Sequence, residues 1–163
     1  MVEAAHWSDF CVAEVGAAAA LSGLVVVAIS INLKQILTVA VLPGRAAETL
    51  VMLVCAMLIC SAGLIPDQPE RIFGIETLVF AAAICAVSFK SQLHAASTMK
   101  GSPIHWWAVR LAVSIGAVAP IVIGGILLCL GRAEGAYWIA AGVMALLAAG
   151  VFNSWVLLIE ILR

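Results

Sequence analysis

Apolar residues are grouped into five long segments, and this grouping is the dominant pattern of the 163-residue chain. The segments span residues 10–32, 46–64, 75–89, 107–130 and 137–161. The hydrocarbon core of a bilayer is about 30 Å thick, so about 20 helical residues cross it. The pattern predicts an all-α integral membrane protein, a single domain in which five transmembrane helices form a bundle. A four-crossing alternative would make the third and shortest segment re-entrant.

The composition agrees with a chain that is surrounded by lipid. Hydrophobic residues make up 65% and charged residues 10%, whereas soluble domains carry about 25% charged residues. We therefore expect a multi-pass protein of the cell membrane, with the lipid bilayer as its main partner. A net charge of -1 gives no basis for nucleic-acid binding. The N-terminal residues carry Glu3 and Asp9 in place of the basic stretch of a signal peptide, so we expect the first helix to be retained.

Basic residues are unevenly distributed between the two ends of the segments. With the N-terminus outside, the cytoplasmic side receives six Lys or Arg residues and the opposite side two. The six are Lys34, Arg45, Lys90, Lys100, Arg110 and Arg163, and the two are Arg71 and Arg132. This asymmetry is the positive-inside pattern. It predicts an outside N-terminus and, with five crossings, a cytoplasmic C-terminus.

Small residues form a stripe on the first predicted helix. Gly16, Gly23 and Ser30 are spaced by seven residues and share one face. Such stripes let helix backbones approach closely in a membrane. Glu14 and Asn32 lie on the opposite face. Since neither face suits lipid, we expect this helix at the centre of the bundle.

The polar residues inside the segments fall into two layers. The outer layer contains Glu14 and Glu76, and the inner layer contains Asn32, Arg45, Glu48, Asn153 and Glu160. A carboxylate in hydrocarbon costs about 2.5–3.5 kcal/mol on insertion scales, so Glu14 must face protein, water or a proton. Arg45 and Glu48 are three residues apart, and an ion pair along the helix is their simplest interpretation. The region between the layers offers only three hydroxyl groups, Ser22, Ser88 and Ser114, and no charged midplane site typical of a transporter.

The two asparagines of the inner layer lead to a prediction about helix packing. Asn32 ends the first helix, and Asn153 lies near the end of the fifth, on a face shared with Gly142 and Ala149. An unpaired amide in lipid is costly. We therefore expect these two helices to pack together or share a neighbour, with both asparagines in one polar network.

Cysteine and histidine residues give no metal-binding pattern. The five cysteines have no metal-ligand spacing and are expected to act as small hydrophobic residues, although a Cys11–Cys129 disulfide stays open. His94 and His105 could ligate a haem, but two interfacial histidines are the simpler interpretation. We expect no metal and no cofactor. The longest connector, residues 90–105, is the expected place for a short interfacial helix or a small partner-binding loop.

No motif in the chain specifies a reaction. A Ser/His/Asp arrangement, a His-Glu-x-x-His motif and a phosphate-binding glycine loop are all missing from the sequence. We therefore expect a non-enzymatic protein that acts as an oligomer or as an accessory or regulatory subunit of a membrane complex. Its partner would be a second copy or another membrane protein. The alternative is a homo-oligomeric ion or proton channel or transporter that uses Glu14 and Glu76.

Overall fold

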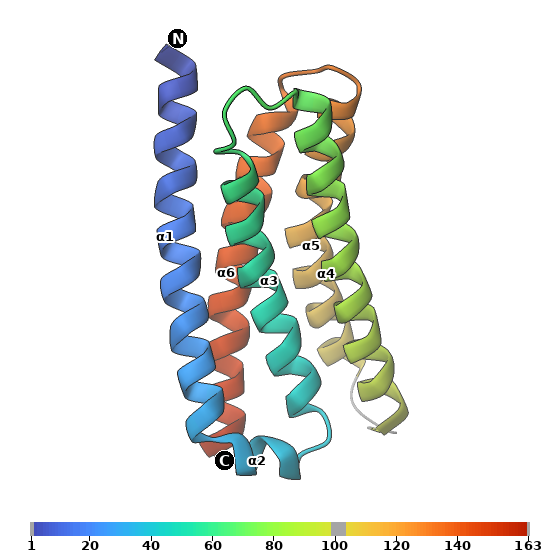
Figure 1. Ribbon diagram of the computed structural model, residues 1–163. Helices are drawn as coiled ribbons and strands as arrows, with labels where there is room; N and C mark the ends of the chain where they lie inside the picture. Colours follow the sequence, from blue (N-terminus) through green and yellow to red (C-terminus); the bar gives the residue numbers. More distant parts are fainter. Residues whose placement is uncertain (1, 99–103, 163) are drawn as a thin grey trace.

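The computed structural model describes residues 2–98 and 104–162, which form six helices joined by short connections (Figure 1). They are α1 (Val2–Ile31), α2 (Leu33–Thr38), α3 (Leu42–Ala62), α4 (Glu70–Thr98), α5 (Ile104–Cys129) and α6 (Gly135–Leu162). All except α2 are long and apolar enough to cross a membrane. The number of spanning helices predicted from the sequence is confirmed.

Helix α4 is much longer than the apolar segment that predicted it. Its membrane-compatible part, Glu70–Ala95, has 26 residues, which is sufficient for a full crossing without a re-entrant turn. Ser91 and Ala95 are buried, so packing continues the helix beyond the apolar stretch. The described part of residues 90–105 forms no separate short helix, because residues 90–98 continue α4 and residues 104–105 begin α5; residues 99–103 lie outside the described part of the structure. The short helix is α2, which packs Ile36 against Leu42.

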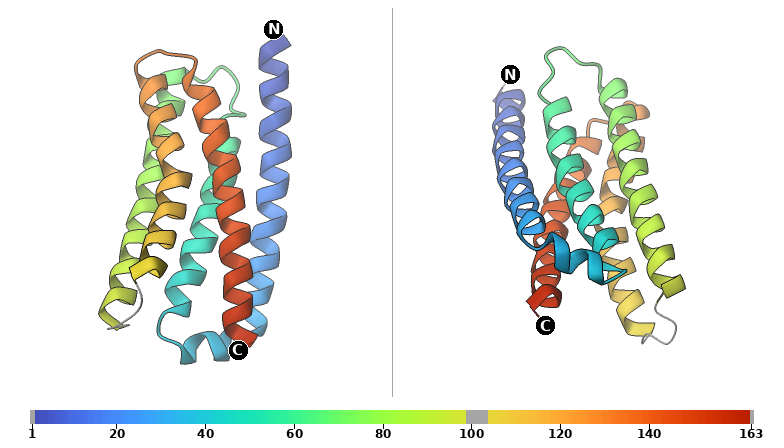
Figure 2. Two further views of the ribbon diagram at one scale, coloured as in Figure 1. Left: turned by 180° about the vertical axis from the view of Figure 1, so that it is seen from behind. Right: turned by 60° about the horizontal axis from the view of Figure 1, so that its bottom comes forward.

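Helices α3, α4, α5 and α6 form a four-helix bundle, and α1 lies outside it (Figures 1 and 2). Helix α3 packs against α1, α4 and α6, whereas α1 packs mainly against α3 and only lightly against α6. Only 11% of the α1 span is buried, compared with 56% of the α3 span. The expectation that the first helix is central is therefore wrong, and α3 holds that position.

Close approaches between helix backbones are made inside the four-helix bundle. A Cβ atom added to Gly124 of α5 would lie 2.7 Å from the carbonyl oxygen of Gly135 and 2.9 Å from the amide nitrogen of Ile139, both in α6. A Cβ on Gly74 of α4 would lie 2.9 Å from the carbonyl oxygen of Gly125. These helices pack at distances that only glycine allows at the crossing points.

Candidate functional site

A buried carboxylate is the main feature of the inner polar layer. Glu48 of α3 is 2% exposed, and the Ser114 hydroxyl of α5 donates a hydrogen bond to its Oε1 at 3.2 Å. Arg45 lies one turn earlier on α3 and is half-buried. Ser114 had been assigned to the region between the layers, but the structure makes it a partner of Glu48. The prediction of an Arg45–Glu48 ion pair stays a prediction.

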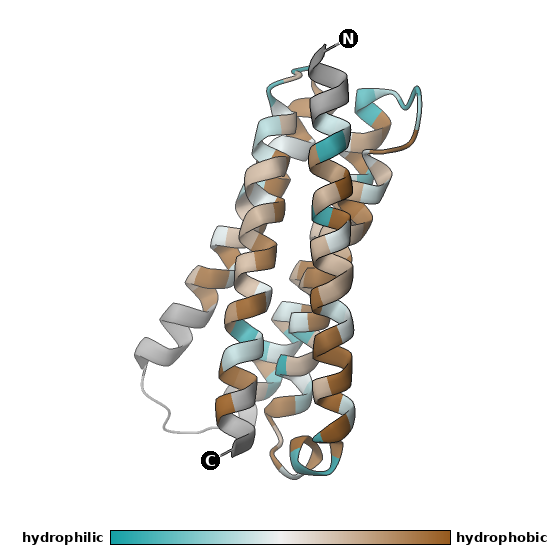
Figure 3. Cartoon of the chain, turned by 90° about the vertical axis from the view of Figure 1, so that its left-hand side faces the viewer, coloured by the Kyte–Doolittle hydropathy of each residue, from teal (hydrophilic) through white to brown (hydrophobic). Residues whose placement is uncertain are grey.

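Helix α4 brings further hydroxyl groups to the same end of the bundle. Ser88 and Ser91 are both buried. A Cβ on Gly44 at the start of α3 would lie 2.9 Å from the Ser91 hydroxyl oxygen, so α3 and α4 approach closely here. In Figure 3 hydrophilic segments gather at this lower end of the molecule and in the connections. Glu48 and these hydroxyl groups thus form a buried polar cluster within the four-helix bundle.

The two asparagines do not use each other as partners. Helices α1 and α6 do contact each other and share α3 as a neighbour, so the packing prediction is confirmed. The Asn32 side-chain amide donates to the Ala28 carbonyl oxygen at 2.9 Å, an oxygen that also accepts the backbone N–H of Asn32. The Asn153 amide donates to the Met52 sulfur of α3 at 3.7 Å. The expected single network is replaced by two separate contacts.

The outer carboxylates lie on opposite sides of α3. Glu76 of α4 accepts a hydrogen bond from the Gln68 amide at 2.7 Å. Glu14 of α1 is half-buried, and among the described residues its Oε2 is buried without a hydrogen-bond partner. Helix α1 packs against α3 and α6, whereas α4 packs against α3 and α5. The fold of one chain therefore does not bring Glu14 and Glu76 into one site.

The structure places two cysteines beside Glu14. Cys11 of α1 and Cys60 of α3 are both buried in the same apolar cluster, and their side chains are neighbours of each other and of Glu14. Cys129 lies elsewhere, with its sulfur 3.9 Å from the Arg71 carbonyl oxygen. A Cys11–Cys129 disulfide is therefore excluded in this fold. The sequence carried one usable signal, because Cys11 lies near the start of one helix and Cys60 near the end of the next, and antiparallel neighbours bring such positions together.

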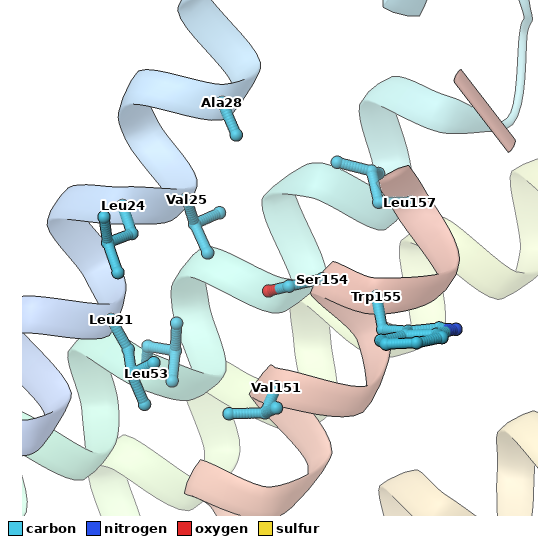
Figure 4. Close-up of a pocket in the computed structure, with 9 residues that line it drawn as sticks. All are labelled: Leu21, Leu24, Val25, Ala28, Leu53, Val151, Ser154, Trp155 and Leu157. Carbon is cyan, nitrogen blue, oxygen red and sulfur yellow. The ribbon is translucent and has the colours of Figure 1, made fainter. Parts of the chain in front are cut away.

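Two grooves open on the surface of the helices. One lies between α4 and α5, has a volume of about 700 Å³ and includes Ser88 and Ser114 in its lining. The other lies between α1 and α6, with Leu53 of α3 also in its lining, and has a volume of about 260 Å³ (Figure 4). Except for Ser154, its lining is apolar: Leu21, Leu24, Val25, Ala28, Leu53, Val151, Trp155 and Leu157.

The remaining candidate ligands do not form a cluster. Within residues 2–98 and 104–162 no three His, Cys, Asp or Glu side chains gather as a metal site. His94 is exposed on α4, and the side chain of His105 lies outside the described part of the structure. No protein-family model, curated protein or solved structure matches the chain. Fold and composition define its class, a small multi-pass helical membrane protein.

Proposed function

We propose that this chain is a non-enzymatic membrane protein that works as a homo-oligomer, with an exposed face of α1 as the contact between copies. The observation that carries the proposal is the small-residue stripe of α1, which faces away from the four-helix bundle. A Cβ added to Gly16 or Gly23 meets nothing within 4 Å. These glycines make no close approach within the chain.

The exposed face of α1 has the spacing of a helix–helix seam. Its members alternate at four and three residues and are all exposed: Val12, Gly16, Ala19, Gly23, Val26 and Ser30. This repeat is the one by which left-handed helix pairs interdigitate, and small residues at it allow close backbone contact in lipid. We call these six residues the α1 outer face.

The opposite side of α1 is already used. Cys11, Ala18 and Val25 are buried and are also spaced by seven residues. They form the narrow stripe that packs against the four-helix bundle. Since α1 has one satisfied seam and one open seam, it is suited to link its own bundle to a second copy. Ser30 is compatible with a helix–helix contact in lipid, because its hydroxyl already donates to the Val26 carbonyl oxygen at 2.8 Å.

The orientation follows the positive-inside rule. With the N-terminus outside, α2 and the polar cluster around Glu48 lie at the cytoplasmic side, together with Lys34, Lys90 and most other basic residues. The open glycines are then distributed along α1 from the outer to the inner leaflet. Labelling of Lys34 from the cytoplasmic side only would support this orientation.

Replacement of the open glycines tests the proposal. The double variant Gly16→Leu/Gly23→Leu fills the outer face without touching the rest of the chain. Native mass spectrometry in mild detergent should show dimers or larger oligomers for the unmodified protein and mostly monomers for the double variant. The matched control is Gly116→Leu, because Gly116 of α5 is equally open. A monomeric unmodified protein, or oligomers that survive in the double variant, would contradict the proposal; a different protein bound in place of a second copy would also do so.

The alternative, a conducting oligomer that uses Glu14 and Glu76, is less compatible with this geometry. Glu14 precedes Gly16 by two residues, about 200° around the helix. A dimer formed through the α1 outer face therefore points Glu14 toward its own bundle and away from the contact. We expect no proton or cation flux in liposomes, and no change with Glu14→Gln. Flux that disappears with Glu14→Gln would favour the channel.

A further inference from the structure

We propose that Cys11 and Cys60 form a reversible disulfide that links α1 covalently to α3, with Glu14 as the proton acceptor for the reacting thiol. Neither the oligomer proposal nor the polar cluster around Glu48 gives these three side chains a chemical role. The inference does not rest on self-association, because the bond is made within one chain.

The geometry brings the two thiols together from different helices. Cys11 and Cys60 are 1% and 2% exposed, they belong to the same apolar cluster, and their side chains are neighbours. The Cys11 side chain also lies close to Gly63, which is three residues after Cys60. A Cβ built on Gly63 would lie 3.4 Å from the Cys11 sulfur and 3.5 Å from the Cys60 carbonyl oxygen. The Cys11 sulfur is thus packed against the last turn of α3, where the Cys60 side chain originates.

The depth of the pair is suitable for exchange with groups near the membrane surface. Cys11 lies four residues after Trp7, where the α1 span begins, and Cys60 lies two residues before Ala62, where the α3 span ends. At about 1.5 Å per residue, the thiols are about 3–6 Å inside the ends of these spans. With the N-terminus outside, this is the non-cytoplasmic side, where disulfides persist.

Glu14 provides a proton acceptor, which a buried pair of thiols otherwise lacks. It lies three residues after Cys11 on the same helix, where side chains are neighbours. Its Oε2 is buried without a hydrogen-bond partner in the described part of the chain. A thiol must lose its proton before it can attack a disulfide. The carboxylate of Glu14 is positioned to accept that proton from Cys11.

The reaction is a thiol–disulfide exchange with a disulfide-bearing oxidant. Cys11 transfers its proton to Glu14, and its thiolate attacks one sulfur of the oxidant to form a mixed disulfide. The other oxidant sulfur leaves as a thiolate and takes up the proton from Glu14. Cys60 then transfers its proton to Glu14, and its thiolate attacks the Cys11 sulfur. This step forms the Cys11–Cys60 bond and breaks the mixed disulfide, and the oxidant sulfur released from Cys11 takes up the second proton and leaves as a thiol. The protein loses two hydrogens, and the oxidant is reduced to two thiols.

The bond would fix a helix that packs mainly against a single neighbour, α3. Helix α1 is attached to the bundle mainly by its narrow inner stripe and, at its other end, through α2. A disulfide near the N-terminal end of α1 would secure the end that has no covalent neighbour in the bundle. Reduction would leave that end held by packing alone, including the stacked Trp7 and Phe10 rings, whose centroids are 5.5 Å apart.

The test uses the full-length protein and a small neutral disulfide, 2-hydroxyethyl disulfide. After oxidation, remaining thiols are alkylated in denaturant and counted by intact mass, and linked peptides are mapped. The reduced chain, with its five cysteines, gives five adducts, and the oxidised chain should give three. The missing two should map to a Cys11–Cys60 peptide. Five remaining adducts, or a linked peptide between any other two cysteines, would overturn the proposal.

Variants separate the pair from the other cysteines and from Glu14. Cys60→Ser should keep all four remaining thiols, whereas the control Cys55→Ser, on the same helix and also buried, should still lose two. Glu14→Gln should slow oxidation at least about tenfold without changing its endpoint, and Glu76→Gln should not slow it. An unchanged rate in Glu14→Gln would remove Glu14 from the proposal. Counting the thiols of the unmodified protein by intact mass tests the Cys11–Cys60 pair even if a cysteine variant does not fold. The result is independent of the oligomer measurements, which test the proposed function.

Discussion

Replacement of Gly124 by alanine tests the arrangement of the four-helix bundle. The new methyl group would lie 2.7 Å from the Gly135 carbonyl oxygen and 2.9 Å from the Ile139 amide nitrogen. Both are backbone atoms, so no side chain can rotate away, and α5 and α6 must separate. Gly116→Ala is the matched control, since it lies on the same helix with nothing within 4 Å.

The two substitutions should change the free energy of unfolding by different amounts. Alanine is favoured over glycine within a helix by about 1 kcal/mol, and this gain applies to both variants. Overpacking at Gly124 costs about 1–3 kcal/mol, which offsets or exceeds the gain. Gly116→Ala should therefore be neutral or stabilising by up to about 1 kcal/mol, and Gly124→Ala should be less stable than Gly116→Ala by about 1–3 kcal/mol.

Reversible unfolding in mixed micelles, titrated with a denaturing detergent, measures this difference as a shift between the two midpoints. The free energy of unfolding of Gly124→Ala should be the lower one, with a loss of α5–α6 contacts. Equal midpoints for the two variants would mean that α5 and α6 do not cross at Gly124 and Gly135. The reasoning about the bundle would then be wrong.

Two further substitutions test the inner polar layer. Asn153→Leu should weaken the fold without abolishing it, because hydrogen bonds between membrane helices average about 0.6 kcal/mol and rarely exceed 2; Ser154→Ala, whose hydroxyl bonds only to its own helix, is the control. Glu48→Leu should destabilise by about 1–3 kcal/mol, since it leaves the buried Ser114 hydroxyl without its acceptor, whereas Glu48→Gln keeps an acceptor and should cost less. Unfolding midpoints measure both effects, and a Glu48→Leu protein as stable as Glu48→Gln would contradict this role.

The spanning helices could be predicted because each apolar run is close to the length of helix that crosses a bilayer. Their ends were less predictable. Hydropathy located the third run at residues 75–89, but α4 extends from Glu70 to Thr98, since helical geometry continues into polar residues that pack on α3. Similarly, α3 begins at Leu42 with Pro43 in its first turn, a position where proline is well accommodated. Hydropathy identifies the part that crosses lipid and not the whole helix.

The position of α1 could not be read from its pattern. The two faces that avoid lipid were visible in the sequence, but a pattern cannot distinguish a partner in the same chain from one in another chain. The structure shows that the Ala18 side is used and the Gly23 side is open. The contacts of the site also needed the tertiary fold, because Ser114 and Glu48 are 66 residues apart.

The central claim, that the α1 outer face meets a second copy, can be tested directly by photo-crosslinking in lipid. A photoreactive amino acid is placed at single positions along α1, in bilayers that contain the full-length protein. Crosslinked dimers should form from positions 16, 19, 23, 26 and 30, with yields that follow the four-three spacing. Positions 17, 24 and 31 are also exposed but lie about 100° or more around the helix from the centre of that face, so they should give few dimers. Equal yields at both sets of positions, or no dimers at all, would contradict the account.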